Sequence, residues 1–319
     1  MKKEVYISKT PKIYKNNKLN QANFGNFNHN DYQIFLYLIT KIGGVDAKGK
    51  YLQPNQLQRE HILTAKELSK EFNIDIKNSY RILKKSTDKL MKTDIRVQEL
   101  DSDSIARINV CSKAIYNKQE GKISIKFTDD IMPYLAQVRQ RFVLYNLKEV
   151  TNFKSLYTTR FYELMQEFKH TGWMVKTIPE LRKSFAIEET QFKLYADLKR
   201  FTFGRAVDEI NSIYKINVKF EEIKEGRKVV AIKFIFENAK FIEIKDPVTG
   251  IVTKQYAKLK TDPKLIISEK KARKTKTIQN KTESSDKRKS NKAKTSTFNN
   301  TKSIKSIVSN VLSKFSIFK

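Results

Sequence analysis

Side chains that can hydrogen-bond to nucleic acid gather between residues 191 and 205. The guanidinium of Arg200 has the planar pair of donors that matches O6 and N7 of a guanine. Asp197, one turn earlier, can accept from a cytosine amino group or orient Arg200. The candidate base-contacting residues are Lys193, Tyr195, Asp197, Lys199, Arg200 and Arg205. A solvated helix face is the alternative for each residue taken singly.

A second cationic group lies at a predicted hairpin tip. Residues 216–220 and 228–236 alternate apolar and polar side chains around Glu225 and Gly226, which is typical of a β-hairpin. Lys224, Arg227 and Lys228 at this tip can bind phosphates, contacts that orient a protein on DNA without specifying sequence. A solvated turn is the alternative.

The elements that must position these residues follow one order in both halves of the chain. In the second half, a helix over 152–169 precedes a capping box at Thr177 and Glu180, and a helix over 195–214 leads into the hairpin. The last of these helices is expected to kink at Gly204. In the first half, a helix starting near residue 30 and stopping at Gly43 precedes a capping box at Thr64 and Glu67. A helix over 75–91, with Tyr80 buried, and strands over 95–100, 105–116 and 122–127 follow.

Six residue pairs support an internal repeat, each separated by 113 positions. Thr64, Glu67, Leu68, Lys70, Phe72 and Ile74 match Thr177, Glu180, Leu181, Lys183, Phe185 and Ile187. Helix, capped helix, long helix and hairpin form the order of a winged helix-turn-helix. The sequence therefore predicts an α+β fold with two winged helix-turn-helix domains in tandem.

The long helix of the first half also carries polar and basic residues. They are Lys77, Asn78, Arg81, Lys84 and Lys85. These side chains can contact DNA as an auxiliary site. The strands between residues 95 and 127 are longer than a simple wing and can serve a protein interface instead, and both uses remain open.

Charge is concentrated at the C-terminal end. The 319 residues carry a net charge of +30, and residues 254–319 alone hold 19 Lys and Arg against 4 Asp and Glu. Such a chain favours a polyanionic partner. The basic tail residues Lys270, Lys271, Arg273, Lys274, Lys287, Arg288 and Lys289 can bind phosphates without specificity, or serve only solubility.

The segment over 241–302 is predicted to be a mostly disordered basic linker and tail, because large apolar residues are scarce in it. Residues 303–318 form a possible amphipathic helix. Three binding targets for this helix stay open: a groove on a partner protein, an anionic membrane surface, or another part of this protein.

Several classes of chemistry are not supported. One cysteine, Cys111, and three histidines distant in sequence give no metal-binding pattern, so no metal site and no cofactor are predicted. No phosphate-binding GxxxxGK[ST] loop and no two-metal carboxylate set occur, so no catalytic residue is assigned and the chain is not expected to be an enzyme. Apolar residues 34–39 form the longest such run, too short to span a bilayer. With one cysteine in the chain, we expect a soluble protein of a reducing compartment, such as the cytoplasm.

Five segments of the chain resemble the plasmid replication initiators that bind iterons. They are residues 157–164 (YTTRFYEL), 179–182 (PELR), 197–200 (DLKR), 207–211 (VDEIN) and 225–234 (EGRKVVAIKF). Residues 144–147 (LYNL) also fit, leading into the second domain. The similarity covers roughly residues 10–238, and Gly204 with its neighbours Phe201 and Phe203 departs from the more regular helix of that family.

The resemblance implies a function. Family members bind repeated sites at the origin, help open adjacent AT-rich DNA and recruit the host initiator and helicase. Monomers start replication, while dimers commonly repress the initiator's own gene or limit copy number. The second domain is implied to recognise the repeat through Asp197 and Arg200, beside the basic Lys199, while the first domain dimerises and touches DNA.

The predicted organisation has five parts. They are a flexible arm over 1–27, winged-helix domains over 28–145 and 146–240, a disordered segment over 241–302 and the possible helix over 303–318. The alternative function is a winged-helix transcriptional regulator without a replication role, because fold alone does not specify function.

Overall fold

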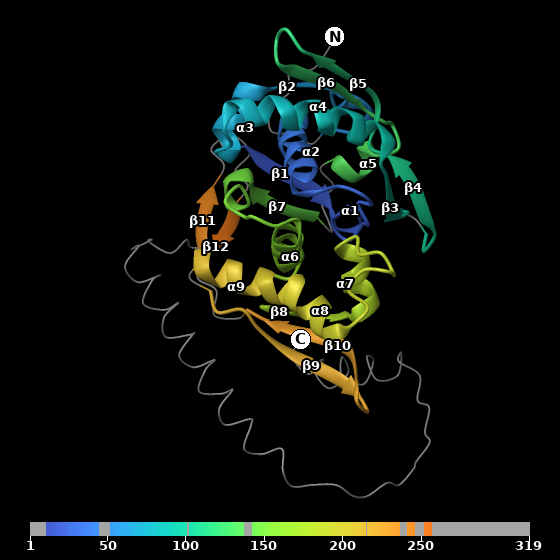
Figure 1. The fold of residues 1–319 in the computed structure, drawn as a ribbon, viewed down its shortest axis with the longest axis vertical. Helices are drawn as coiled ribbons and strands as arrows, with labels where there is room; N and C mark the ends of the chain where they lie inside the picture. The colour runs from blue at the N-terminus through green and yellow to red at the C-terminus, as the bar shows by residue number, and fades with distance from the viewer. Residues whose placement is uncertain are drawn as a thin grey trace, which may run out of the picture. The chain divides into compact units, whose positions relative to one another are not determined.

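The first half of the chain combines helices with three small antiparallel sheets (Figure 1). The computed structural model describes residues 11–44, 52–100, 102–136, 142–214 and 216–236, and the backbone of strands at 241–245 and 252–256. The helices of the first half are α1 (Asn17–Asn20), α2 (His29–Ile42), α3 (Ala65–Phe72), α4 (Ile76–Lys92) and α5 (Met132–Leu135), with a 3-10 helix at Pro54–Gln56. Its strands are β1 (Lys12–Asn16), β2 (Glu60–Thr64), β3 (Asp94–Gln98), β4 (Ile105–Asn109), β5 (Cys111–Asn117), β6 (Lys122–Phe127) and β7 (Phe142–Asn146). The sheets are β2-β6-β5, β3-β4 and β1-β7.

The second half places helices on one antiparallel sheet of order β8-β10-β9. After a 3-10 helix at Leu147–Glu149, it contains α6 (Leu156–Glu167), α7 (Ile178–Ser184), α8 (Tyr195–Phe201) and α9 (Phe203–Ile213), and strands β8 (Trp173–Thr177), β9 (Lys219–Glu225) and β10 (Lys228–Ile235). Aromatic residues from helices and sheet fill its core: the Phe234 ring centroid lies 4.8 Å from that of Phe161 and 5.7 Å from that of Phe203. Both halves are winged-helix domains, as the sequence predicts.

The internal repeat is a repeat of local structure. Strand β2 ends at Thr64 where α3 begins, and β8 ends at Thr177 where α7 begins. Both capping boxes form: the threonine hydroxyl accepts from the backbone N–H of Glu67 or Glu180 at 3.1 and 3.3 Å, and each carboxylate accepts in return. The residues just beyond the two helices, Asn73 and Ala186, both have a φ of 53°. The same strand–cap–helix–turn unit is therefore built twice.

Residues predicted as a flexible arm are structured from residue 11 onward. Strand β1 pairs with β7 from Lys12–Asn146 to Asn16–Phe142. Ile13, Leu19 and Phe24 are buried in the core. The prediction of an arm over 1–27 is thus wrong for residues 11–27, because polar side chains that suggested solvent exposure are themselves buried between the two halves.

Two further expectations need correction. The segment over 241–302, predicted to be disordered, contains strands β11 (Phe241–Lys245) and β12 (Val252–Tyr256), which pair with each other. Tyr80, predicted to be buried, is 38% exposed. Its ring lies over Gly121 in the β5–β6 turn, where an added Cβ would be only 2.0 Å from the ring. Residues 257–319, with the basic tail and the possible helix at 303–318, lie outside the described residues.

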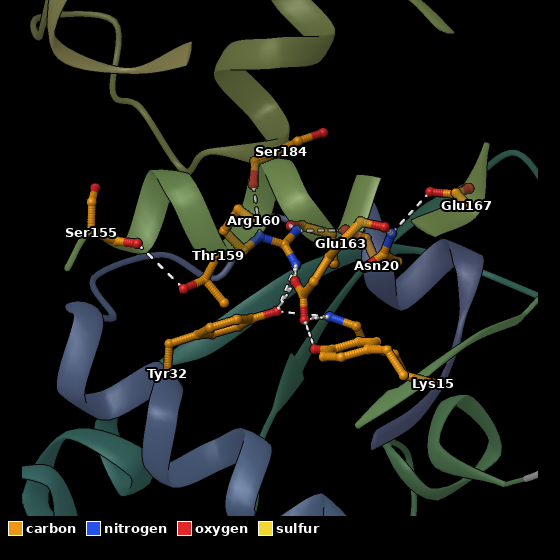
Figure 2. A network of polar contacts seen from close by, with 11 residues as sticks. Lys15, Asn20, Tyr32, Ser155, Thr159, Arg160, Glu163, Glu167 and Ser184 are labelled. Carbon is orange, nitrogen blue, oxygen red and sulfur yellow. Dashed lines mark hydrogen bonds and ion pairs between the residues drawn. The ribbon is translucent and has the colours of Figure 1, made fainter. Parts of the chain in front are cut away.

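A buried polar network joins α6 to the first half (Figure 2). Glu163 accepts from Lys15 Nζ at 2.6 Å, from the Tyr32 hydroxyl at 2.6 Å and from Arg160 Nη1 at 2.9 Å. Arg160 also donates to the carbonyls of Asn20, Ala22 and Ser184 at 2.6, 2.9 and 3.1 Å. One helix thus binds β1, α1 and α2 on one side and the end of α7 on the other.

Burial and charge act against each other in this network. Burial lowers the pKa of Lys15 to about 7, although Glu163 opposes the shift. Burial alone raises the pKa of Glu163, but the positive charges of Lys15 and Arg160 outweigh it, and the net direction is downward. The carboxylate therefore stays ionised at the centre of the network.

Candidate nucleic-acid interface

The helix predicted over 195–214 is broken into two. Thr202, between α8 and α9, has φ −117° and ψ −103°, and its hydroxyl donates to the Leu198 carbonyl at 2.5 Å. A Cβ at Gly204 would lie 2.6 Å from the Lys199 carbonyl oxygen, so the close approach after the break requires glycine. The break is therefore two residues earlier than the predicted kink at Gly204, and that glycine permits it.

One face of α8 and of the loop before it is open to solvent. Arg200 is exposed with 70% of its side chain accessible, and its Nη2 lies 3.3 Å from Asp197 Oδ1. Lys193 and Leu194, just before the helix, and Phe201 at its end are also exposed. Arg205 is exposed on α9, beyond the break. These residues can meet base edges in a groove.

Two predicted base-contacting residues are directed to the sheet instead. The hydroxyl of Tyr195 donates to Glu222 Oε1 in β9 at 2.8 Å, and Lys199 Nζ lies 2.8 Å from the same oxygen. These two donors and the positive charge of Lys199 hold the pKa of Glu222 below its ordinary value. Both side chains thus join α8 to the wing, and a DNA contact by either stays a prediction.

The predicted wing is the turn between β9 and β10. Gly226 has a φ of 61°, which a side chain would strain, and the space around it is open. Arg227 and Lys228 at the tip and Lys224 on β9 are exposed, with Lys224 Nζ 3.5 Å from Glu222 Oε2. The tip therefore presents positive charge to solvent at the end of the sheet.

The first half presents its own exposed basic face on α4. Lys77, Asn78, Arg81, Lys84 and Lys85 are all exposed, and Arg81 Nη2 donates to Asn78 Oδ1 at 3.0 Å. The strands predicted over 95–127 form two hairpins. In the β3–β4 hairpin, Arg107 donates two hydrogen bonds to the Asp94 carboxylate, at 2.6 and 3.0 Å. The β5–β6 hairpin pairs with β2 and forms the wing of the first domain.

Sequence reasoning did not assign roles to three residues that hold this surface in place. Glu209 in α9 accepts from the Lys154 backbone at 2.7 Å and from the Thr158 hydroxyl at 2.6 Å, joining α9 to α6. Asn211 exchanges two hydrogen bonds with the backbone of Val218, at 2.9 and 2.7 Å, just before β9. Arg182 in α7 donates to the carbonyls of Phe192 and Gln191 at 3.2 and 2.7 Å. Their signal in the sequence was membership of the VDEIN and PELR segments.

The described residues offer little other chemistry. Among them, no three His, Cys, Asp or Glu side chains gather as a metal site would require. Burial lowers the pKa values of His29 and His61 and raises the pKa of the Cys111 thiol to about 12. Within the same part of the chain, every helix is too short or too polar to cross a membrane.

Family models match both halves. A model described as Initiator Replication protein, WH1, matches residues 12–166, and one described as Initiator Rep protein, WH2, matches residues 177–236. The first match ends at residue 166 in the last turn of α6, beyond the domain boundary predicted between residues 145 and 146.

Curated relatives come from Escherichia coli. A replication initiation protein is 25% identical over 190 residues, which are 58% of this chain and 58% of that protein. A PI protein is 25% identical over 146 residues, 40% of this chain and 48% of that protein. The chain thus spans about half the length of the curated relatives it matches.

A solved structure shares the fold. The crystal structure of Pi initiator protein in complex with iteron DNA has a TM-score of 0.58 to this chain at 22% identity, covering 72% of this chain and 98% of that one. This likeness supports the arrangement of two winged-helix domains.

Proposed function

Because the chain belongs to the family of replication initiator proteins with two winged-helix domains, we propose that it binds iterons, the repeated sites of a plasmid origin, and starts replication there. The domain over 146–240 recognises the repeat, and the domain over 28–145 dimerises and adds a DNA contact through α4. The chain catalyses no reaction itself: it helps open adjacent DNA and recruits the host initiator and helicase.

The observation that supports this proposal most is the exposed face of α8 beside a cationic wing. Lys193 just before the helix and Asp197 and Arg200 within it are accessible, and Arg227 and Lys228 are exposed at the hairpin tip. A helix with base-reading side chains and a wing with phosphate-binding cations is the arrangement by which winged helices bind duplex DNA. The likeness to an initiator solved with iteron DNA agrees with it.

Two further properties belong to the proposal. A monomer–dimer equilibrium separates initiation from repression of the initiator's own gene, and the protein acts in the bacterial cytoplasm. The basic tail beyond residue 257 adds sequence-independent affinity through its lysines and arginines. Its last segment, 303–318, contacts a partner, a membrane or the protein itself.

Footprinting of the full chain on the DNA flanking its own gene, at moderate salt, tests the proposal. We expect several evenly spaced protected repeats beside an AT-rich stretch. A single palindrome over a promoter would instead identify a transcriptional regulator. Protection no stronger than on random DNA would reject specific recognition altogether.

A further inference from the structure

An aromatic stack lies beneath the exposed arginine of α8. The Arg200 guanidinium carbon is 4.2 Å from the centroid of the Phe201 ring. The Phe201 ring is in turn stacked on Phe192, with centroids 5.7 Å apart and an interplanar angle of 25°. Phe201 is 42% exposed, so part of its ring is open to solvent. The Phe201 ring therefore lies between the Arg200 guanidinium and the Phe192 ring.

The base of this stack is held by the fold. Phe192 adopts a φ of 46°, and its ring packs edge-on against Tyr157 of α6 at 6.4 Å. Arg182 of α7 binds the carbonyls of Glu188, Gln191 and Phe192, which holds the loop before α8. The helix break at Thr202 ends α8 directly after Phe201. The loop before α8 and the end of α8 are thus both fixed by the fold, and together they support the ring on which Arg200 stacks.

We propose that Phe201 is a positioning residue for base recognition by Arg200. An arginine that stacks on an aromatic face keeps the hydrogen-bonding edge of its planar guanidinium free. Asp197, 3.3 Å from Nη2, restrains the same group from the side. The stack therefore limits the orientations of a long, flexible side chain before DNA binds, and it presents the guanidinium edge to O6 and N7 of one guanine. This inference rests on the proposed function, since it needs specific duplex binding.

Binding of the full chain to its footprinted repeat, with each base pair replaced in turn, tests the inference. Arg200→Ala identifies the base pair that Arg200 recognises. At that pair, and at no other, Phe201→Ala is expected to lower the discrimination roughly two- to fivefold, the size of an exposed cation–π contact. The double variant is expected to lose no more than Arg200→Ala alone, and Phe201→Tyr, which keeps the ring, is expected to retain the discrimination.

Two controls separate positioning from general damage. Phe201→Leu keeps the apolar bulk without an aromatic face and is expected to behave like Phe201→Ala, so the test survives poor folding of the alanine variant. Leu194→Ala removes another exposed apolar side chain, directly before the same helix, and is expected to leave discrimination at the Arg200 base pair intact. Unchanged discrimination in Phe201→Leu, or an equal loss at every base pair, would overturn the inference while leaving repeat binding in place. Absence of any base preference in the wild type would reject the proposed function as well.

Discussion

Lys15 in β1 and Glu163 in α6, distant in sequence, form an ion pair of 2.6 Å whose side chains are both fully buried. Water cannot solvate either charge, so Lys15 depends on Glu163, while Glu163 is stabilised by both Lys15 and Arg160. Glu163→Gln keeps the shape but takes the counter-charge away from the buried Arg160, and from Lys15 when it is protonated. We expect it to lower the free energy of unfolding by about 3–5 kcal/mol, measured by urea denaturation.

The matched control is Glu120→Gln at the surface. Glu120 pairs with Lys122 while both side chains remain partly exposed. Solvent screens such a pair, so its loss is expected to change the free energy of unfolding by less than about 1 kcal/mol. Equal effects of the two substitutions would contradict the structural role of the buried network.

The same network predicts a pH dependence. The pKa of Lys15 is about 7 in the folded protein and about 10.4 in an unfolded chain. Between these values the unfolded chain binds a proton that the folded protein lacks, so the free energy of unfolding gains a contribution that rises with pH. Below pH 7 this contribution is lost. Lys15→Met removes this titrating group. The difference in free energy of unfolding between wild type and variant is therefore expected to change between pH 7 and about 10.4. Parallel curves of unfolding free energy against pH would contradict the prediction.

The two capping boxes allow a paired test of local stability. Thr64→Ala and Thr177→Ala each remove a hydroxyl that accepts from the backbone at the start of a helix. Each is expected to lower the free energy of unfolding by about 1 kcal/mol. Serine at either position keeps the hydroxyl and is expected to recover most of the loss. An alanine variant as stable as wild type would show that the cap contributes nothing there.

The basic tail predicts a change in salt dependence. Replacing Lys271, Arg273 and Lys274 with glutamine removes three cations that can bind phosphates. The slope of log affinity against log salt is then expected to fall by up to about 2.7, equally on specific and random duplexes. A loss confined to the repeat would instead assign the tail a part in sequence recognition.

Local elements could be predicted from the sequence where a few neighbouring residues are enough to specify them. The capping boxes at Thr64 and Thr177 and the Gly226 turn were predicted at the correct positions. Strands β1 and β7 were not, because neither forms without the other and they are far apart in the chain. The buried roles of Lys15 and Arg160 were missed for a related reason: isolated charged residues indicate solvent until their partners are known.

The candidate site was predicted in part. The exposure of Arg200 and Arg227 followed from helix and hairpin periodicity. The contact of Tyr195 and Lys199 with Glu222 did not, because it depends on how α8 packs against β9. The stack of Phe192, Phe201 and Arg200 likewise depends on the break at Thr202 and the loop held by Arg182.

The central claim is that the second winged helix recognises sequence through α8. Arg200 on α8 and Arg81 on α4 are both exposed arginines, one on the candidate DNA-binding helix of each domain. The decisive measurement compares Arg200→Ala with Arg81→Ala by fluorescence anisotropy on the repeat and on scrambled DNA. Arg200→Ala is expected to weaken binding to the repeat by about 1–3 kcal/mol with little change on scrambled DNA, while Arg81→Ala weakens both alike. Equal losses on both duplexes for Arg200→Ala, with specificity lost in Arg81→Ala, would contradict the account.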